Sequence, residues 1–244
     1  MQVNFVIGGT QKGGTSALDS FLRQHPEICM PETRKELHFF DREADDTDYK
    51  KYHANFRPKP QHRAIGEASP MYMYWETAPY RIWKYNPKMK WLLVLRNPVE
   101  RAFSGWNMET KRGNEKLSFA EAIERESERC REALPLQHRV YSYVDRGFYA
   151  HQVRRLFNIF GEENCLVLLN EELRNDHKNS LDRVFRFLGV DDSFVPPEAS
   201  IFEHEYDDGI DSDLRSRLID IFRFDIKALE RLLKCDLSAW HSNQ

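Results

Sequence analysis

The stretch "NFVIGGTQKGGTSAL", residues 4–18, decides the fold of this chain. An apolar run is followed by a glycine-rich loop and then by a helical pattern. This order builds a cradle for phosphate, because a helix N-terminus offers unpaired N–H groups and the positive end of its dipole. The lysine stands before the last glycine pair, whereas ATP-binding loops end in G-K-[ST]. The alternative to an anion-binding loop is an ordinary tight turn between strand and helix. The candidate anion-binding residues are Lys12, Gly13, Gly14, Thr15 and Ser16.

Short apolar runs alternate with longer amphipathic segments along the chain, which is typical of βαβ units in a parallel sheet flanked by helices. The predicted strands are residues 4–8, 64–67, 91–95 and 165–169. The predicted helices are residues 16–24, 99–111, 118–130, 146–160, 181–188 and 213–233, with a capping box of Ser118 and Glu121 at the start of the third. Segments 45–60 and 192–209 indicate surface loops. We therefore predict one α/β domain over residues 1–244.

Composition restricts the class of protein. A chain of 244 residues with 41% hydrophobic residues can bury one large core. The net charge of −3 argues against a nucleic-acid partner, so any anion site is local. Four widely spaced cysteines predict a reducing compartment. No stretch reaches the roughly 18 apolar residues of a membrane span, and the first strand begins too early for a signal peptide, so we expect a soluble cytoplasmic protein.

The second informative stretch is "LLVLRNPVERAFSGW", residues 92–106. Arg96 ends a predicted strand, where open α/β sheets bind their ligands. Ser104 follows about two helical turns later. If the chain folds back at the proline, the guanidinium and the hydroxyl would meet at one phosphate. The alternative is that Arg96 pairs with Glu100 and that Ser104 only packs.

The third stretch is "RKELHFFDRE", residues 34–43, which places Glu36, His38 and Asp41 beside two phenylalanines. A partly desolvated carboxylate has a raised pKa and serves as a general base. The alternative for Glu36 is an ion pair with a neighbouring basic residue on a wet surface. His38 and Asp41 lack another histidine at ligand spacing, so we predict no metal site.

Together and in this order, these stretches resemble the PAPS-dependent sulfotransferases, in particular the branch of the heparan sulfate N- and O-sulfotransferase domains and their bacterial relatives. "KGGTSAL" is similar to the 5′-phosphosulfate loop of that family, "KELHFFD" to its E-x-x-F-F segment, and "LLVLRNPVERAFSGW" to its 3′-phosphate motif. "GFYAHQVRRLFNIFGEENCLVLLNEEL" and "LLKCDLSAW" are similar to later segments. The resemblance covers nearly the whole chain.

The resemblance implies the sulfotransferase fold and transfer of a sulfuryl group from PAPS, without a metal, to a hydroxyl or amine of a carbohydrate or small metabolite. It implies that Glu36 is the catalytic base, that Lys12 stabilises charge on the leaving phosphate, and that His38 orients Glu36 or the acceptor. The implied PAPS-binding residues are Lys12, Gly13, Gly14, Thr15 and Ser16 at the 5′ end, with Arg96 and Ser104 at the 3′-phosphate.

The chain departs from the heparan sulfate branch at two places. A lysine follows the glutamate of the next strand in those enzymes, whereas Glu67 is followed here by Ala68, so no catalytic lysine is assigned there. Their late basic loop with a cysteine pair corresponds here to the acidic residues 201–217. The aromatic-rich residues 71–83 would stack on sugars or pack in the core.

Two other functions compete with this interpretation. A kinase-like phosphotransferase would need a G-K-[ST] loop and a strand-end aspartate for magnesium, and neither is clear. A non-catalytic nucleotide-binding module would keep the loop and Arg96 but would not need the carboxylate of Glu36.

Overall fold

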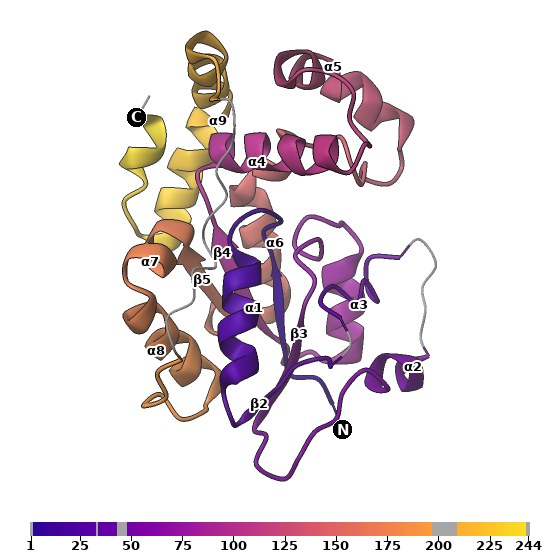
Figure 1. Ribbon diagram of the computed structural model, residues 1–244, viewed down its shortest axis with the longest axis vertical. Coiled ribbons are helices and arrows are strands. Elements are labelled where there is room, and N and C mark those ends of the chain that lie inside the picture. Colours follow the sequence, from indigo (N-terminus) through magenta and orange to yellow (C-terminus); the bar gives the residue numbers. More distant parts are fainter. Residues whose placement is uncertain (1, 33, 43–47, 197–208, 243–244) are drawn as a thin grey trace. The chain divides into compact units, whose positions relative to one another are not determined.

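Figure 1 shows the computed structural model of the protein, which describes residues 2–32, 34–42, 48–196 and 209–242. The chain divides into two compact units. The first comprises Met1–Leu95 and Arg155–Glu203, and the second comprises Arg96–Arg154 and His204–Gln244. The prediction of a single domain over residues 1–244 stays a prediction.

The first unit is built on a five-stranded sheet with the order β2-β3-β1-β4-β5. Its strands are β1 (Phe5–Gly9), β2 (Ile28–Cys29), β3 (Ala64–Ala68), β4 (Lys90–Leu95) and β5 (Cys165–Leu169). Every neighbouring pair is parallel, so the predicted parallel α/β fold is confirmed. The chain places β2 and β3 on one side of β1 and then β4 and β5 on its other side. The position beside β1 where this direction reverses is a switch point, and α/β sheets bind ligands there.

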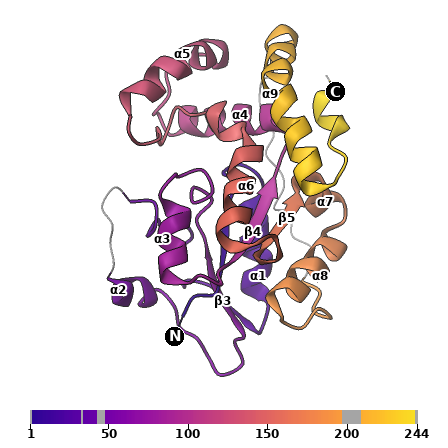
Figure 2. The same ribbon diagram turned by 180° about the vertical axis from the view of Figure 1, so that it is seen from behind.

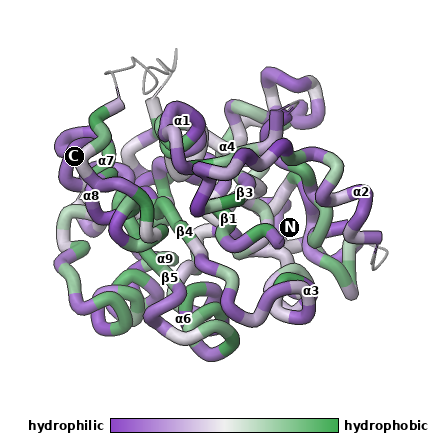
Figure 3. The backbone as a smooth tube through the Cα atoms, turned by 90° about the horizontal axis from the view of Figure 1, so that it is seen from below, coloured by the Kyte–Doolittle hydropathy of each residue, from purple (hydrophilic) through white to green (hydrophobic). Residues whose placement is uncertain are grey.

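Helices cover both faces of this sheet. The helices wholly inside the unit are α1 (Thr15–Gln24), α2 (Tyr49–His53), α3 (Ala78–Tyr85), α7 (Asn170–Asn175) and α8 (His177–Leu188), and a 3-10 turn, η2 (Glu162–Asn164), precedes β5. Figure 1 shows α1 in front of the strands, and the reverse view in Figure 2 shows α3 over the other face, where Phe160 at the end of α6 also packs its ring 5.3 Å from that of Trp91. Phe21 of α1 and Phe185 of α8 pack with Leu92 and Val94 of β4 in one buried cluster. Figure 3 shows the apolar character of β4 and β5.

The aromatic side chains of residues 71–83 are buried before α3 and partly exposed within it. Tyr72, Met73 and Trp75 are buried and belong to the core. Tyr80 and Trp83 of α3 remain exposed, with their ring planes 10° from parallel. The alternative that these residues pack in the core therefore holds for the first part of the stretch.

The second unit is helical. It contains α4 (Pro98–Lys111), α5 (Phe119–Glu132), α9 (Ser212–Leu233) and the 3-10 turns η1 (Asp145–Gly147) and η3 (Ser238–His241), while α6 (Tyr149–Phe160) crosses the unit boundary. The predicted capping box is present, since the Glu121 carboxylate accepts a hydrogen bond from the Ser118 N–H at 2.9 Å. All six predicted helices are confirmed, although their ends shift by up to four residues.

Several short elements escaped prediction. The loop expected over residues 45–60 contains α2, so the prediction is wrong there. Tyr52 of α2 packs its ring 4.7 Å from that of Phe39, and this tertiary contact outweighs the polar local sequence. Residues 45–47, and residues 197–208 of the second expected loop and of the acidic region, lie outside the described residues. In the described part of the chain, no helix is long and apolar enough to cross a membrane.

Candidate active site

The loop between β1 and α1 depends on Gly13 and Gly14. A Cβ atom on Gly13 would collide with the carbonyl oxygen of Val94, so only glycine lies this close to β4. Gly14 precedes α1 with a φ of 110°, a conformation that side chains disfavour. The first turn of α1 carries no acidic residue. These features match a helix N-terminus that binds an anion.

Asn170 fastens this loop to the sheet. It is the first residue of α7, directly after β5, and its buried Nδ2 donates a hydrogen bond to the Gly13 carbonyl at 2.8 Å. On the other side of the loop, the Thr10 N–H donates to the carbonyl of Val94 at 3.0 Å. Sequence reasoning missed Asn170, although a polar residue directly after a predicted strand was a usable signal.

The segment of residues 34–42, which carries the predicted base, has neither helix nor strand. It is attached to the end of β3, because the Glu36 N–H donates to the Ala68 carbonyl at 2.9 Å and the His38 N–H donates to Ser69 Oγ at 3.3 Å. Glu67 lies beneath it and is fully buried. Ser69 and two tyrosines donate to the Glu67 carboxylate at 2.7 to 2.9 Å. Burial raises the pKa of Glu67, and these hydrogen bonds oppose the rise.

Backbone strain is concentrated at the predicted catalytic residues. Among the described residues, four other than glycine have a positive φ, and three of them are Lys12 (68°), Glu36 (62°) and His38 (51°). Such conformations cost about 1–3 kcal/mol each and persist where surrounding contacts enforce them, often at functional sites. The hydrogen bonds to the end of β3 supply that enforcement for Glu36 and His38.

His38 connects two carboxylates. Its Nδ1 is 2.9 Å from Asp41 Oδ2 and its Nε2 is 3.3 Å from Glu36 Oε2. The hydrogen bond to Asp41, followed by that to Glu36, raises the pKa of His38 to about 9 against the effect of burial. At neutral pH His38 is therefore an imidazolium that donates to both carboxylates. The Glu36 side chain keeps 32% of its surface exposed, so solvent-borne groups reach it.

Lys35 joins this cluster to the loop. Its ammonium nitrogen lies 2.8 Å from Ser16 Oγ, 3.3 Å from Thr15 Oγ1 and 3.7 Å from Glu36 Oε1. Burial lowers the pKa of Lys35, and the nearby Glu36 carboxylate opposes this effect. Sequence reasoning treated the basic residues beside Glu36 only as surface partners. The structure thus brings Thr15, Ser16, Glu36 and His38 into one connected group.

Arg96 and Ser104 belong to the second unit. Nη2 of Arg96 is 3.7 Å from Glu100 Oε2, so the ion pair considered as the alternative is present. Glu100 also accepts a closer hydrogen bond from Arg215, at 2.6 Å. Ser104 lies on α4 with 1% of its surface exposed. The Arg96 guanidinium keeps 21% exposure.

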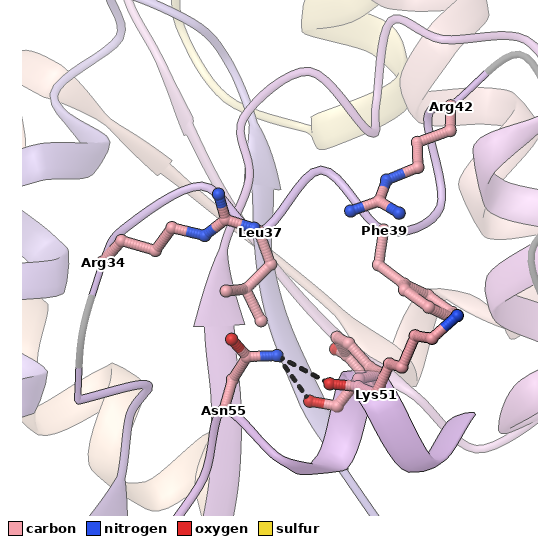
Figure 4. A pocket seen from close by; sticks show the side chains of 7 residues that line it. Arg34, Leu37, Phe39, Arg42, Lys51 and Asn55 are labelled. Carbon is pink, nitrogen blue, oxygen red and sulfur yellow. Dashed lines mark hydrogen bonds between the residues drawn. The ribbon is translucent and has the colours of Figure 1, made fainter. Parts of the chain in front are cut away.

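Figure 4 shows a pocket of about 200 Å³ beside the 34–42 segment. Leu37 and Phe39 contribute apolar lining, while Arg34, Arg42 and Lys51 add positive charge. The predicted catalytic side chains do not line it. The pocket is therefore a different place from the connected group of Thr15, Ser16, Glu36 and His38.

In the described part of the chain, no group of three or more histidine, cysteine, aspartate or glutamate side chains could hold a metal ion. The structure forms no disulfide among the four cysteines, all of which are described.

A glycine loop that leads into a helix N-terminus at the switch point of a parallel sheet, linked through a lysine to a solvent-accessible carboxylate, is an arrangement of the nucleotide-dependent transferase class. The sulfotransferase domain family matches residues 3–206. The chain belongs to the sulfotransferase family.

Known proteins support this assignment. The structure is similar to the crystal structure of a sulfotransferase from Alicyclobacillus acidocaldarius, with 35% identity, a TM-score of 0.87, and coverage of 99% of this chain and 100% of that one. A human bifunctional heparan sulfate N-deacetylase/N-sulfotransferase 3 is 31% identical over 82% of this chain and 24% of its own length. The chain thus spans about a quarter of the length of such curated relatives. A mouse sulfotransferase complexed with PAP shares the fold, with a TM-score of 0.52, 20% identity, and coverage of 78% of this chain and 59% of that one.

Replacing Asn170 by alanine is expected to destabilise the protein. The buried Gly13 carbonyl loses its side-chain donor, and such a loss costs about 1–3 kcal/mol. Asn175→Ala, at the exposed end of the same helix, is the matched control and should change the free energy of unfolding by less than about 0.5 kcal/mol. Urea denaturation measures both, and equal stability of the two variants would contradict the role of Asn170 as loop anchor.

Proposed function

We propose that this protein transfers a sulfuryl group from PAPS to a hydroxyl or amine of an acceptor. The observation that carries the proposal is Lys35, whose ammonium joins the hydroxyls of the phosphate loop to the carboxylate of Glu36. One group of side chains thereby combines an anion cradle with a proton acceptor. Membership of the sulfotransferase family supports PAPS as the donor.

The residues of the chain fit PAPS. Lys12, Gly13, Gly14, Thr15 and Ser16 would hold its 5′ end, through the ammonium, the N–H of Gly14 and the two hydroxyls at the N-terminus of α1. The Gly13 N–H donates to the Thr10 carbonyl at 2.9 Å, so Gly13 contributes by shaping the loop. Arg96 and Ser104 would hold the 3′-phosphate, by resemblance to the family motif. Bound PAPS supplies an activated sulfuryl group, which needs cradling but no Walker-type magnesium ligands.

The charged cluster would perform the proton transfer. Glu36 takes the proton of the acceptor, and the imidazolium of His38 holds the Glu36 carboxylate in place through its Nε2–H. Asp41 in turn fixes the His38 ring through Nδ1. Lys12 offsets negative charge on the leaving phosphate.

The acceptor in this proposal is a carbohydrate or a small metabolite. Support comes from relatives whose names specify heparan sulfate N-sulfotransferase activity. N-desulfated heparin, the same polymer with its amines acetylated, and simple hydroxyl compounds, incubated with labelled PAPS, distinguish amine from hydroxyl transfer.

The proposal also covers the domain, the cellular compartment and the partners of the activity. We propose that residues 1–244 act as one sulfotransferase domain, in the cytoplasm, without a metal or a nucleic-acid partner. The near balance of positive and negative charge supports the lack of a nucleic-acid partner. The free state of the described cysteines supports the cytoplasm. Activity that survives EDTA would support the metal-free reaction.

The experiment that tests the donor site compares PAP with 5′-AMP. PAP should raise the unfolding temperature by mass action, equally with and without EDTA, and should bind more tightly than 5′-AMP. Arg96→Ala should weaken PAP binding by roughly ten-fold to several hundred-fold, because one or two charge-assisted hydrogen bonds are lost. Isothermal titration calorimetry measures these affinities.

Arg125→Ala is the matched control for this test. Arg125 pairs with Glu128 at 3.7 Å, the same separation as that of Arg96 and Glu100, but on the exposed surface of α5. This variant should bind PAP normally. Equal affinity of the unaltered protein for PAP and 5′-AMP would refute the 3′-phosphate assignment, and a shift seen only with ATP and magnesium would favour a phosphotransferase.

A further inference from the structure

Lys35 occupies the position where the loop and the predicted base meet. Its ammonium contacts the hydroxyls of Thr15 and Ser16 in the first turn of α1 and lies 3.7 Å from Glu36 Oε1. Its side chain is 23% exposed, so it is held along the protein surface rather than extended into solvent. The ammonium therefore lies between the groups that would bind donor and acceptor.

A transferred group must pass through that same region. The loop holds the donor phosphate, and Glu36 must lie within hydrogen-bond reach of the acceptor oxygen or nitrogen. The sulfur atom lies between these two partners during transfer. We propose that Lys35 is a further catalytic residue, which contacts the oxygens of the sulfuryl group and stabilises their negative charge. This inference rests on the proposed function.

A bond forms between the acceptor oxygen or nitrogen and sulfur, while the bond between sulfur and the bridging oxygen of the 5′-phosphate breaks. The acceptor proton goes to Glu36, and the electron pair of the broken bond stays on the phosphate. Lys35 keeps its protons throughout and acts by charge and hydrogen bonding.

Apart from Lys12, which the proposed function assigns to the leaving phosphate, the other nearby cations have different partners. His38 donates to Asp41 and Glu36. Arg34, Arg42 and Lys51 line the separate pocket. β3 ends at Ala68, which carries no charge. Lys35 is thus placed to supply the charge that the resemblance would have assigned to a lysine at position 68.

The test uses Lys35→Met, which keeps the length of the side chain and removes its charge, and Lys35→Arg, which keeps the charge. Lys88→Met is the control, because Lys88 is exposed in the turn between α3 and β4. Calorimetry gives the affinities for PAP, which lacks the sulfuryl group, and for PAPS. Release of PAP from PAPS in the presence of water alone gives a rate that needs no identified acceptor.

For Lys35→Met we expect PAP affinity to stay within about three-fold of that of the unaltered protein, because the loop remains. The ratio of PAPS to PAP affinity should fall about ten-fold, the effect of one charge-assisted hydrogen bond. PAP release should slow by about 10²-fold to 10³-fold, as for loss of one donor to a developing oxyanion. Lys35→Arg should recover part of both losses, and Lys88→Met should show neither.

Amine labelling provides a readout without a variant. PAPS should protect Lys35 of the unaltered protein from acetylation more strongly than PAP does. Equal protection by the two nucleotides, an unchanged affinity ratio in Lys35→Met, or parallel loss of PAP and PAPS binding would overturn the role of Lys35. If neither nucleotide binds the unaltered protein, the proposed function itself fails.

Discussion

Replacing Glu36 by glutamine is expected to slow sulfuryl transfer by about a hundred-fold to ten-thousand-fold, the usual contribution of a general base. Glutamine keeps the shape of the side chain and can still accept a hydrogen bond from His38. It cannot take the acceptor proton. PAP affinity should stay near that of the unaltered protein, because the loop is untouched. Steady-state rates with labelled PAPS and calorimetry with PAP measure the two quantities.

Glu32→Gln is the control for this prediction, since Glu32 is exposed four residues earlier along the chain. It should leave both rate and affinity unchanged. If Glu36→Gln retains near-normal turnover, the base lies elsewhere, and the pH dependence of that turnover tests His38. Hydrogen bonds to Asp41 and Glu36 raise the pKa of His38 to about 9, and the variant loses the Glu36 carboxylate, so the pKa of His38 should fall below that value. A rise of turnover with pH in Glu36→Gln that disappears when His38→Asn is added would assign the base to His38.

The fold followed from the sequence because the central strands β1 and β4 are buried almost throughout, and buried parallel strands read as continuous apolar runs. All four predicted strands are present, each with its ends within one residue of the prediction. β2, with two residues, is too short to show a pattern. Helix α3 has only eight residues and no side-chain cap at Thr77, so its pattern is short, and sequence reasoning missed the start signal that Pro79 in its first turn provides.

The candidate site was harder to predict than the fold. The motif order indicated Glu36 and His38, and the structure places them 3.3 Å apart. Lys35 directly precedes Glu36, but its contact with the loop was not predicted. The 34–42 segment lacks the periodicity that tells which side chains share a face. Positive φ values at Glu36 and His38 are unusual for residues other than glycine, and no local rule predicted them. Long-range hydrogen bonds to the end of β3 determine the conformation instead.

Lys12 should behave differently from Glu36, because one ammonium would serve both the bound phosphate and the leaving group. Lys12→Met is expected to weaken PAP binding about ten-fold, as one charge-assisted hydrogen bond is lost. Transfer should slow by about 10²-fold to 10³-fold as well. Calorimetry and steady-state kinetics on the same preparation separate this pattern from that of Glu36→Gln, which changes the rate alone.

Lys12→Gly separates charge from backbone strain, since glycine adopts the φ of 68° at position 12 more readily than methionine does. The two variants should lose PAP affinity alike if the ammonium is responsible. Burial lowers the pKa of Lys35 most, and the charge of Lys12 lowers it further, so the two ammonium groups interact and their removal should not be additive. Normal PAP affinity in Lys12→Met, or strictly additive rate losses when Lys35→Met is combined with it, would contradict this shared role.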